Sequence, residues 1–391
     1  MMKERFILPD GLVYLDGNSL GPLPRGAAAR VGTTMELEWG RLAIAGWNRA
    51  GWIGQPMALG DRIGRLIGAE PGSVSVGDTL SVKVFQLVAA ALAMRPERKV
   101  VLSDSGNFPS DLYMADGLAE ALGDVQLVVV EPEEIAGRIG PDVAVLMLTE
   151  VDYRTGRKHD MAALTRAAHE AGALTVWDLA HSAGALPVEL AGAGADFACG
   201  CTYKYLNGGP GAPGFAYVAP RHADTARTIL QGWLGHAEPF AFEPGYRPAA
   251  GAERMRVGTP PILQMAALEA ALDIWDEVDV SELRARSIVL SERFIAAVES
   301  ACPDIALVSP RDPEARGSQV SFRFEHGYAA MQALIAHGVV GDFRAPDIMR
   351  FGITPLYLSE EDIDVAAGVI AKVMTERLWD DPAYATRSAV T

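Results

Sequence analysis

The amino-acid sequence predicts an α/β fold, with a mostly parallel sheet in a large domain and a smaller α+β domain beside it. Between residues 99 and 204, short β-rich runs alternate with helical segments, which indicates a parallel sheet covered by helices on both faces. From about Pro261 the pattern changes to long amphipathic helices, followed by a β-like run and a final helix. A chain of 391 residues is long enough for two such domains.

Each element follows from its own residue pattern. Helices are expected over residues 27–42, 81–94 and 161–173, and then over 262–278, 280–301 and a last segment near the C-terminus. Strands are expected over residues 99–104, 125–131, 143–150, 174–180, 196–204 and 320–324. We therefore expect an N-terminal segment of residues 1–50 that joins the small domain, a large cofactor-binding domain of residues 51–265 and a small domain of residues 266–391.

Composition excludes several classes of function. The net charge of −16 and the pI near 4.9 argue against a basic face for nucleic acid and against docking on an anionic membrane. The run MMKERFILPDG has no long apolar stretch, and no later apolar run reaches the length of a membrane span. The three cysteines form neither a disulfide framework nor a zinc-binding spacing. We expect a soluble protein in the cytoplasm, with no bound metal.

Asp178 and Lys204 are the most informative pair in the chain, because each ends an apolar strand-like segment, 26 positions apart (204 − 178). Ligands of parallel sheets bind at the carboxyl ends of the strands. Pyridoxal phosphate needs such a pair, since the lysine amine forms a Schiff base with its aldehyde and the carboxylate keeps its ring nitrogen protonated. An exposed lysine and a helix-capping aspartate are the ordinary alternatives. The glycine-rich run after Lys204 favours the site, because it lets backbone approach a bound group closely.

Three further patterns are compatible with the same site. His181 lies three residues after Asp178 and would face the same cavity, although a single histidine is more often structural. Thr79 and Ser81 stand at a predicted helix start, where hydroxyl and backbone N–H groups can bind phosphate or simply cap the helix. In the run NFPSD, Phe108 could stack on a flat ring and Asp111 could hydrogen-bond to it, and a tight proline turn is the alternative.

Seven motifs then occur in one order along nearly the whole chain. They are LDGNSLGPLP, NFPSD, DLAHSAGA, TYKYLNGGPG, GWLGH, RVGTPPI and DIMRFGITPLY. Each is weak alone, but together the chain resembles the kynureninases, a family in the class V aminotransferase-like group of fold type I pyridoxal phosphate enzymes. The resemblance implies hydrolytic cleavage of the Cβ–Cγ bond of L-kynurenine to anthranilate and L-alanine, in tryptophan degradation, by a homodimer.

The resemblance also implies a role for each matching residue. Lys204 and Tyr203 are expected to be catalytic and to contact the cofactor, with Lys204 carrying it and Tyr203 protonating the β-carbon. Trp233 and Thr259 would be supplied by the neighbouring subunit, so the active site is shared. The other residues expected around the cofactor are Leu80 and Ser81 at the phosphate, Phe108 stacked on the ring, Asp178 at the ring nitrogen with Asp111 nearby, Thr149 at the phenolic oxygen, and His181.

The substrate side of the site rests on the same resemblance. Arg350 matches an arginine that binds the substrate carboxylate bidentately, and its apolar neighbours indicate burial rather than a surface salt bridge. Asn18 would complete that carboxylate site. Eukaryotic members have a histidine near Trp47, and its absence here favours kynurenine over 3-hydroxykynurenine. The family often has Thr, Ser and Asn where this chain has Ser81, Thr149 and Thr259, and hydrogen bonding survives each exchange.

Three rivals share part of this pattern. A cysteine desulfurase or selenocysteine lyase would need a reactive cysteine on a mobile loop, whereas Cys199 and Cys201 lie on a predicted buried strand and Cys302 lies between elements of the second domain. A serine-type aminotransferase does not explain NFPSD together with GWLGH. A protein that binds the ligand without turnover has no need of a Schiff-base lysine. A nicotinamide dehydrogenase is disfavoured because no GxGxxG motif follows a first strand.

Overall fold

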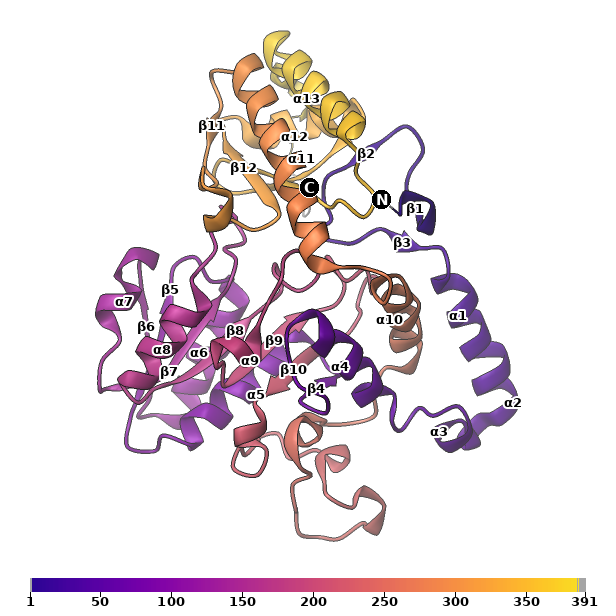
Figure 1. Ribbon diagram of the computed structural model, residues 1–391, viewed down its shortest axis with the longest axis vertical. Helices are drawn as coiled ribbons and strands as arrows, with labels where there is room; N and C mark the ends of the chain where they lie inside the picture. The colour runs from indigo at the N-terminus through magenta and orange to yellow at the C-terminus, as the bar shows by residue number, and fades with distance from the viewer. Residues whose placement is uncertain (1, 385, 387–391) are drawn as a thin grey trace.

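A seven-stranded sheet forms the centre of the computed structural model, which describes residues 2–384 and 386 (Figure 1). The sheet runs in the order β4-β10-β9-β8-β7-β5-β6. The five strands from β9 to β6 are parallel, while β10 is antiparallel to both β9 and β4. The strands are β4 (Val74–Val76), β5 (Val100–Asp104), β6 (Gln126–Val130), β7 (Val143–Thr149), β8 (Leu174–Asp178), β9 (Phe197–Cys201) and β10 (Gly214–Val218).

Helices cover both faces of this sheet, which explains why β5, β7, β8, β9 and β10 are buried along their whole length. The predicted helix at residues 81–94 is confirmed as α5, which packs across β7 to β10. It begins directly after Thr79, at the turn where Thr79 and Ser81 were expected to bind phosphate or cap the helix. The helices of this part are α4 (Gln55–Leu66), α5 (Leu80–Ala93), α6 (Pro109–Leu122), α7 (Ile135–Arg138), α8 (Met161–Glu170), α9 (Leu190–Ala193) and α10 (Ile262–Trp275).

A second, antiparallel sheet lies at the other end of the molecule, in the order β11-β12-β15-β14, and helices α11 and α12 contact its strands (Figure 1). Its register places Asp342 directly opposite Arg350. The elements are α11 (Val280–Ala301), β11 (Ala306–Leu307), β12 (Gln319–Arg323), α12 (Gly327–Ala336), β14 (Asp342–Arg344), β15 (Ile348–Gly352) and α13 (Glu360–Thr375).

The N-terminal segment connects the two ends of the molecule. Strand β2 (Val13–Tyr14) pairs in parallel with β13 (Val339–Val340), and β1 (Phe6–Ile7) pairs with β3 (Leu23–Pro24). The helix expected over residues 27–42 is present as α1 (Ala27–Thr33), a π-helical turn (Thr34–Trp39) and α2 (Gly40–Leu42), followed by α3 (Gly46–Arg49). The α/β fold with a mostly parallel sheet is confirmed, whereas the division at residues 50 and 265 stays a prediction.

Membrane-crossing helices are not found among the described residues, because none of these helices is both long and apolar enough to span a bilayer.

Candidate active site

A cavity of about 270 Å³ opens where β7, β8 and β9 end and α5 and α6 begin. This is the edge of a parallel sheet at which ligands bind. Nine of the residues predicted from the sequence line the cavity together: Leu80, Ser81, Phe108, Asp111, Thr149, Asp178, His181, Tyr203 and Lys204. Thr79, Ser110, Tyr153 and Ala180 complete the lining.

Lys204 follows β9 in a tight loop whose backbone is held by its own hydrogen bonds. The Asn207 amide donates to the Lys204 carbonyl at 3.0 Å, and Asn207 itself has a positive φ of 60°. The Lys204 ammonium lies 3.0 Å from His181 Nε2. Gly21 packs against this loop so closely that a Cβ at Gly21 would lie only 2.3 Å from the Lys204 carbonyl oxygen. The GNSLG motif therefore packs directly on the lysine loop.

Two buried carboxyl groups face this lysine. Asp178 ends β8 and accepts a hydrogen bond from the Ala180 amide at 2.9 Å, while Asp111 lies in the first turn of α6. Burial raises the pKa of Asp178 to about 6, although Lys204 counteracts it. Burial and the Asp178 charge raise the pKa of Asp111 well above its usual value. Two carboxyl groups this close share protons unless a cation separates them.

Two polar atoms in this cavity are left without a hydrogen-bond partner among the described residues. They are Asp111 Oδ2 and His181 Nδ1, and both are buried. Burial is the main cause, and the Lys204 charge the second, that lowers the pKa of His181 well below its usual value, so the imidazole is neutral near pH 7. A buried polar atom without a partner is costly. Ligand groups that bond to these atoms would remove the cost, and the ring and substituents of pyridoxal phosphate fit that description.

The other end of the cavity suits a phosphate. Thr79 caps α5 by accepting a hydrogen bond from the Val82 amide at 3.4 Å, and Ser81 Oγ lies 2.9 Å from Ser110 Oγ at the start of α6. Two helices therefore begin side by side with hydroxyl groups between them. Their first-turn amides and positive dipole ends favour an anion.

Phe108 and Tyr153 form an aromatic wall, with ring centroids 5.0 Å apart and planes at 85°. Phe108 is 39% exposed and lines the cavity. Tyr153 lies four residues after the end of β7 and was not predicted from the sequence. Thr149 Oγ1 donates to the Val151 carbonyl at 3.3 Å.

Arg350 and Asn18 lie behind this wall rather than in the cavity lining. Arg350 is 1% exposed on β15, which agrees with the burial expected from its apolar neighbours. Its guanidinium donates to the Tyr153 carbonyl and, through Nε at 2.6 Å, to Asp342 Oδ1. Asn18 is also buried and donates to Gln319 Oε1 at 3.2 Å. Arg350 is thus connected to the cavity by its hydrogen bond to Tyr153, which lines the cavity.

Three predicted residues lie outside the cavity of this chain. Trp47 on α3 packs edge-on against Trp52, with ring centroids 5.9 Å apart. Trp233 starts a short 3-10 helix and is 42% exposed, and Thr259 is exposed in the loop before α10. The structure does not bring these residues to the other nine within one chain.

Comparisons with known proteins identify the family of this chain. A model of the kynureninase C-terminal domain matches residues 283–370. A kynureninase of Burkholderia pseudomallei (strain 1106a) is 47% identical over 398 residues, covering 100% of this chain and 96% of that protein. The chain belongs to the kynureninase family. A second member, a kynureninase of Pseudomonas fluorescens, is 46% identical over the same share of both chains.

Solved structures show the same fold at low sequence identity. A cysteine desulfurase of Thermococcus onnurineus has a TM-score of 0.80 at 19% identity, covering 96% of this chain and 98% of that one. A C-DES mutant with glycine covalently linked to its pyridoxal phosphate cofactor has a TM-score of 0.80 at 18% identity, covering 94% and 98%. At such identities the likeness shows the fold alone.

The cysteines of this chain do not suit the desulfurase chemistry for which the Thermococcus onnurineus neighbour is named. Cys199 and Cys201 lie on buried strand β9, and Cys302 is 3% exposed at the end of α11. Burial raises the pKa of each thiol, so the thiolate that would be the nucleophile is disfavoured. No group of three or more metal-type ligands is found within the described part of the chain.

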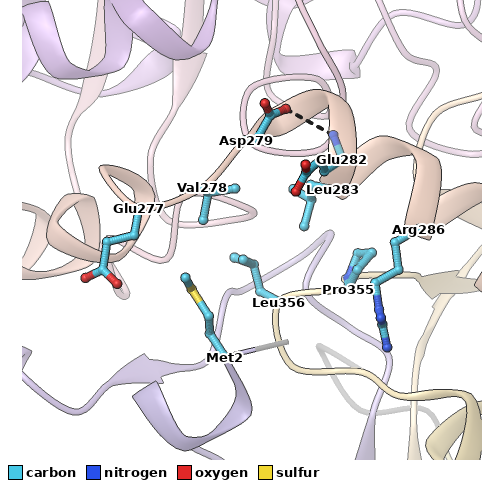
Figure 2. A pocket seen from close by; sticks show the side chains of 9 residues that line it. All are labelled: Met2, Glu277, Val278, Asp279, Glu282, Leu283, Arg286, Pro355 and Leu356. Atoms are coloured by element: carbon cyan, nitrogen blue, oxygen red, sulfur yellow. Dashed lines mark hydrogen bonds between the residues drawn. The ribbon is translucent and has the colours of Figure 1, made fainter.

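A different hollow of about 350 Å³ lies at the turn between α10 and α11. Figure 2 shows Met2 and Leu356 facing this turn, with Arg286 beside Pro355 at its edge. None of the predicted site residues lines it, and most of its polar side chains are exposed. The cavity at Lys204 is therefore the candidate active site.

Proposed function

We propose that this protein cleaves L-kynurenine hydrolytically to anthranilate and L-alanine, using pyridoxal phosphate bound in the cavity at Lys204. The observation that carries the proposal is the meeting of Lys204, Asp178 and His181 at the strand ends of a chain that is 47% identical to a kynureninase over its full length. When bound, the cofactor supplies an aldehyde for an amine and a ring that accepts electrons from the substrate carbons.

The chain's own residues divide the work between binding and proton transfer. Lys204 would hold the cofactor, and its amine would remove the Cα proton of the bound substrate. Asp178 would keep the ring nitrogen protonated. Ser81 and the first amides of α5, which line the cavity, would bind the phosphate, and Phe108 would cover one face of the ring. Water adds to the γ-carbonyl, and the Cβ–Cγ bond breaks.

Tyr203 is proposed to protonate the β-carbon before alanine leaves. Burial and the nearby Cys201 raise the pKa of Tyr203 above its usual value, so its hydroxyl keeps the proton at neutral pH. It lines the cavity next to Lys204, whose ammonium is 5.8 Å from the Tyr203 ring centre. Substitution Tyr203→Phe should slow alanine release while leaving cofactor binding intact. Normal alanine release by that variant would remove Tyr203 from this role.

The shared active site is part of the same proposal, together with a cytoplasmic location. Trp233, Phe240 and Phe242 are 42%, 58% and 76% exposed in the single chain, an apolar surface of the kind that a subunit interface covers. Mixing inactive Lys204→Ala chains with inactive Trp233→Ala chains should restore activity, because a mixed dimer contains one intact site. No recovery on mixing, with dimers formed, would contradict the sharing of Trp233.

The decisive experiment follows both products. Purified protein with pyridoxal phosphate and L-kynurenine should form anthranilate, measured by fluorescence, and alanine, measured by chromatography, in equal amounts. Lys204→Ala should form neither. Activity on 3-hydroxykynurenine alone would keep the reaction but refute the preference inferred at Trp47. Absence of both products with a cofactor-loaded enzyme would favour an aminotransferase or a non-catalytic protein.

A further inference from the structure

The donors of Arg350 are almost fully used inside the protein. Nε and Nη2 donate to the two oxygens of Asp342, Nη2 also donates to Ser19 Oγ at 3.1 Å, and Nη1 donates to the Tyr153 carbonyl. A guanidinium has five N–H groups, so a single N–H of Nη1 remains. Asp342 thus already occupies the bidentate side of Arg350, and Arg350 alone cannot offer a second bidentate pair to a substrate carboxylate.

Arg344 is a second guanidinium beside this one. Its Nη2 lies 2.9 Å from Asp342 Oδ2, so both arginines share one carboxylate. Besides this ion pair, Arg344 Nη1 donates to the Phe343 carbonyl at 2.9 Å, which leaves Nε and one N–H on each terminal nitrogen without a partner among the described residues. Its side chain is 34% exposed, whereas that of Arg350 is 2% exposed. Arg344 therefore combines free donors with access from solvent.

Arg344 also lies within electrostatic reach of the cavity. Arg350, which shares Asp342 with Arg344, donates to the carbonyl of Tyr153, and the Arg344 charge contributes to lowering the pKa of His181; both Tyr153 and His181 line the cavity. Burial, and after it the charge of Arg350, lowers the pKa of Arg344, and the carboxyl groups of Asp342 and Asp16 oppose this shift. An anion between the two guanidinium groups would relieve their repulsion.

The charge balance of the cluster leaves room for such an anion. Two guanidinium groups face the carboxyl groups of Asp342 and Asp16. Burial and the charge of Asp342 raise the pKa of Asp16 to about 7, so near neutral pH Asp16 is protonated part of the time. Asp342 alone does not balance both arginines.

We propose that Arg344 and Arg350 form a two-arginine receptor for the α-carboxylate of the amino-acid substrate, with Asp342 holding the two guanidinium groups in place. The proposal rests on the proposed function for the identity of that substrate. Arg350 contributes its remaining N–H, and Arg344 contributes the second donor from the more exposed side. Arg344 is then a substrate-binding residue of this chain that the sequence motifs did not mark.

The test is Arg344→Gln in the holoenzyme, which removes the charge and keeps a polar side chain. Loss of a charge-assisted hydrogen bond should raise KM for L-kynurenine about 10- to 100-fold and leave kcat within about twofold. The dissociation constant of L-alanine, read from the cofactor's absorbance, should rise by a similar factor. Arg344→Lys keeps the charge and should recover part of the loss.

Two controls separate carboxylate binding from a structural effect. The amine that kynurenine becomes on loss of its carboxylate should bind the variant and the parent enzyme equally. Arg323→Gln, on the exposed edge of β12 with a 3.1 Å ion pair to Asp347, should behave like the parent enzyme. An unchanged KM in Arg344→Gln, or equal weakening of the carboxylate-free amine, would overturn the receptor. If the parent enzyme binds L-alanine but leaves kynurenine intact, the proposed function fails while the receptor is still measured with alanine.

Discussion

Lys83 is the buried cation whose removal has the most predictable cost. It lies within α5 with a side chain 1% exposed, and its ammonium donates to Asp78 Oδ2 at 2.8 Å, to Gln86 Oε1 at 3.2 Å and to the Met255 carbonyl at 2.6 Å. Substitution Lys83→Met keeps the length of the side chain and removes the charge. Asp78, Gln86 and the carbonyl would then each lack a donor.

The magnitude follows from how buried the orphaned partners are. Breaking a buried ion pair typically costs about 3–5 kcal/mol, and the Asp78 side chain is 29% exposed, so we take the lower end, about 3 kcal/mol. Unfolding entropy of roughly 2.1 cal/mol/K per residue amounts to about 0.8 kcal/mol/K for 391 residues. The melting temperature should therefore fall by about 4 °C.

A matched substitution at the surface makes the assay decisive. Lys99 is paired with Asp124 at 2.9 Å, with side chains 45% and 65% exposed. Such a pair contributes at most about 1 kcal/mol, so Lys99→Met should lower the melting temperature by about 1 °C or less. In calorimetry, the double variant Lys83→Met with Asp78→Asn should recover part of the loss, because it removes the unpaired charge. Equal melting temperatures for Lys83→Met and Lys99→Met would refute the reasoning.

Three further substitutions test the site and its support. Gly21→Ala should displace the lysine loop and lower activity at least tenfold, because its Cβ would lie 2.3 Å from the Lys204 carbonyl oxygen. The control Gly32→Ala places its Cβ in open space and should leave steady-state kinetics unchanged. Equal kinetics for both variants would contradict the contact. Asp178→Asn should raise the melting temperature of the cofactor-free protein at pH 8, because burial raises the pKa of Asp178 to about 6 and the ionised carboxylate destabilises the folded protein above that pH. The same variant should bind the cofactor more weakly in an absorbance titration. Tighter binding would count against the ring-nitrogen role. Burial opposes ionisation of Asp196, but hydrogen bonds from two histidine rings lower its pKa below 3.8, so the ionised carboxylate stabilises the fold above about pH 4 and this effect is lost as pH falls. Asp196→Asn should therefore flatten the fall in melting temperature below pH 4. Parallel curves of melting temperature against pH for the variant and the parent would exclude this contribution.

Residues at the ends of parallel strands were the part of the site that the sequence could predict. Asp178 ends β8 and Lys204 follows the end of the neighbouring strand β9 by three residues, and parallel pairing places both strand ends at the same edge of the sheet. The rule needs only the strand pattern, which was readable from the buried apolar runs. The antiparallel edge formed by β4 and β10 was not predicted, because a three-residue strand and a strand after a glycine-rich loop have little pattern of their own.

Partners that meet through turns or through sheet register could not be predicted in the same way. Asp342 and Arg350 are opposite each other because β14 and β15 pair antiparallel in one register, and a shift of one residue would separate them. Tyr153 reaches the cavity because the turn after β7 is fixed by long-range contacts, among them the hydrogen bonds of Gln319 to that turn. Neither arrangement leaves a local mark in the sequence.

The N-terminal segment explains why motifs from both ends of the chain belong to one site. Gly21 has no room for a side chain because it packs on the Lys204 carbonyl, and a Cβ at Gly352 would lie 2.5 Å from Asn18 Oδ1. Residues 18 to 21 are therefore wedged between the lysine loop and strand β15, which carries Arg350. Any movement of β15 toward or away from the cavity must be accommodated by this segment. Because this segment packs closely on both sides, the distance between Lys204 and Arg350 is set by backbone contacts that only small residues permit.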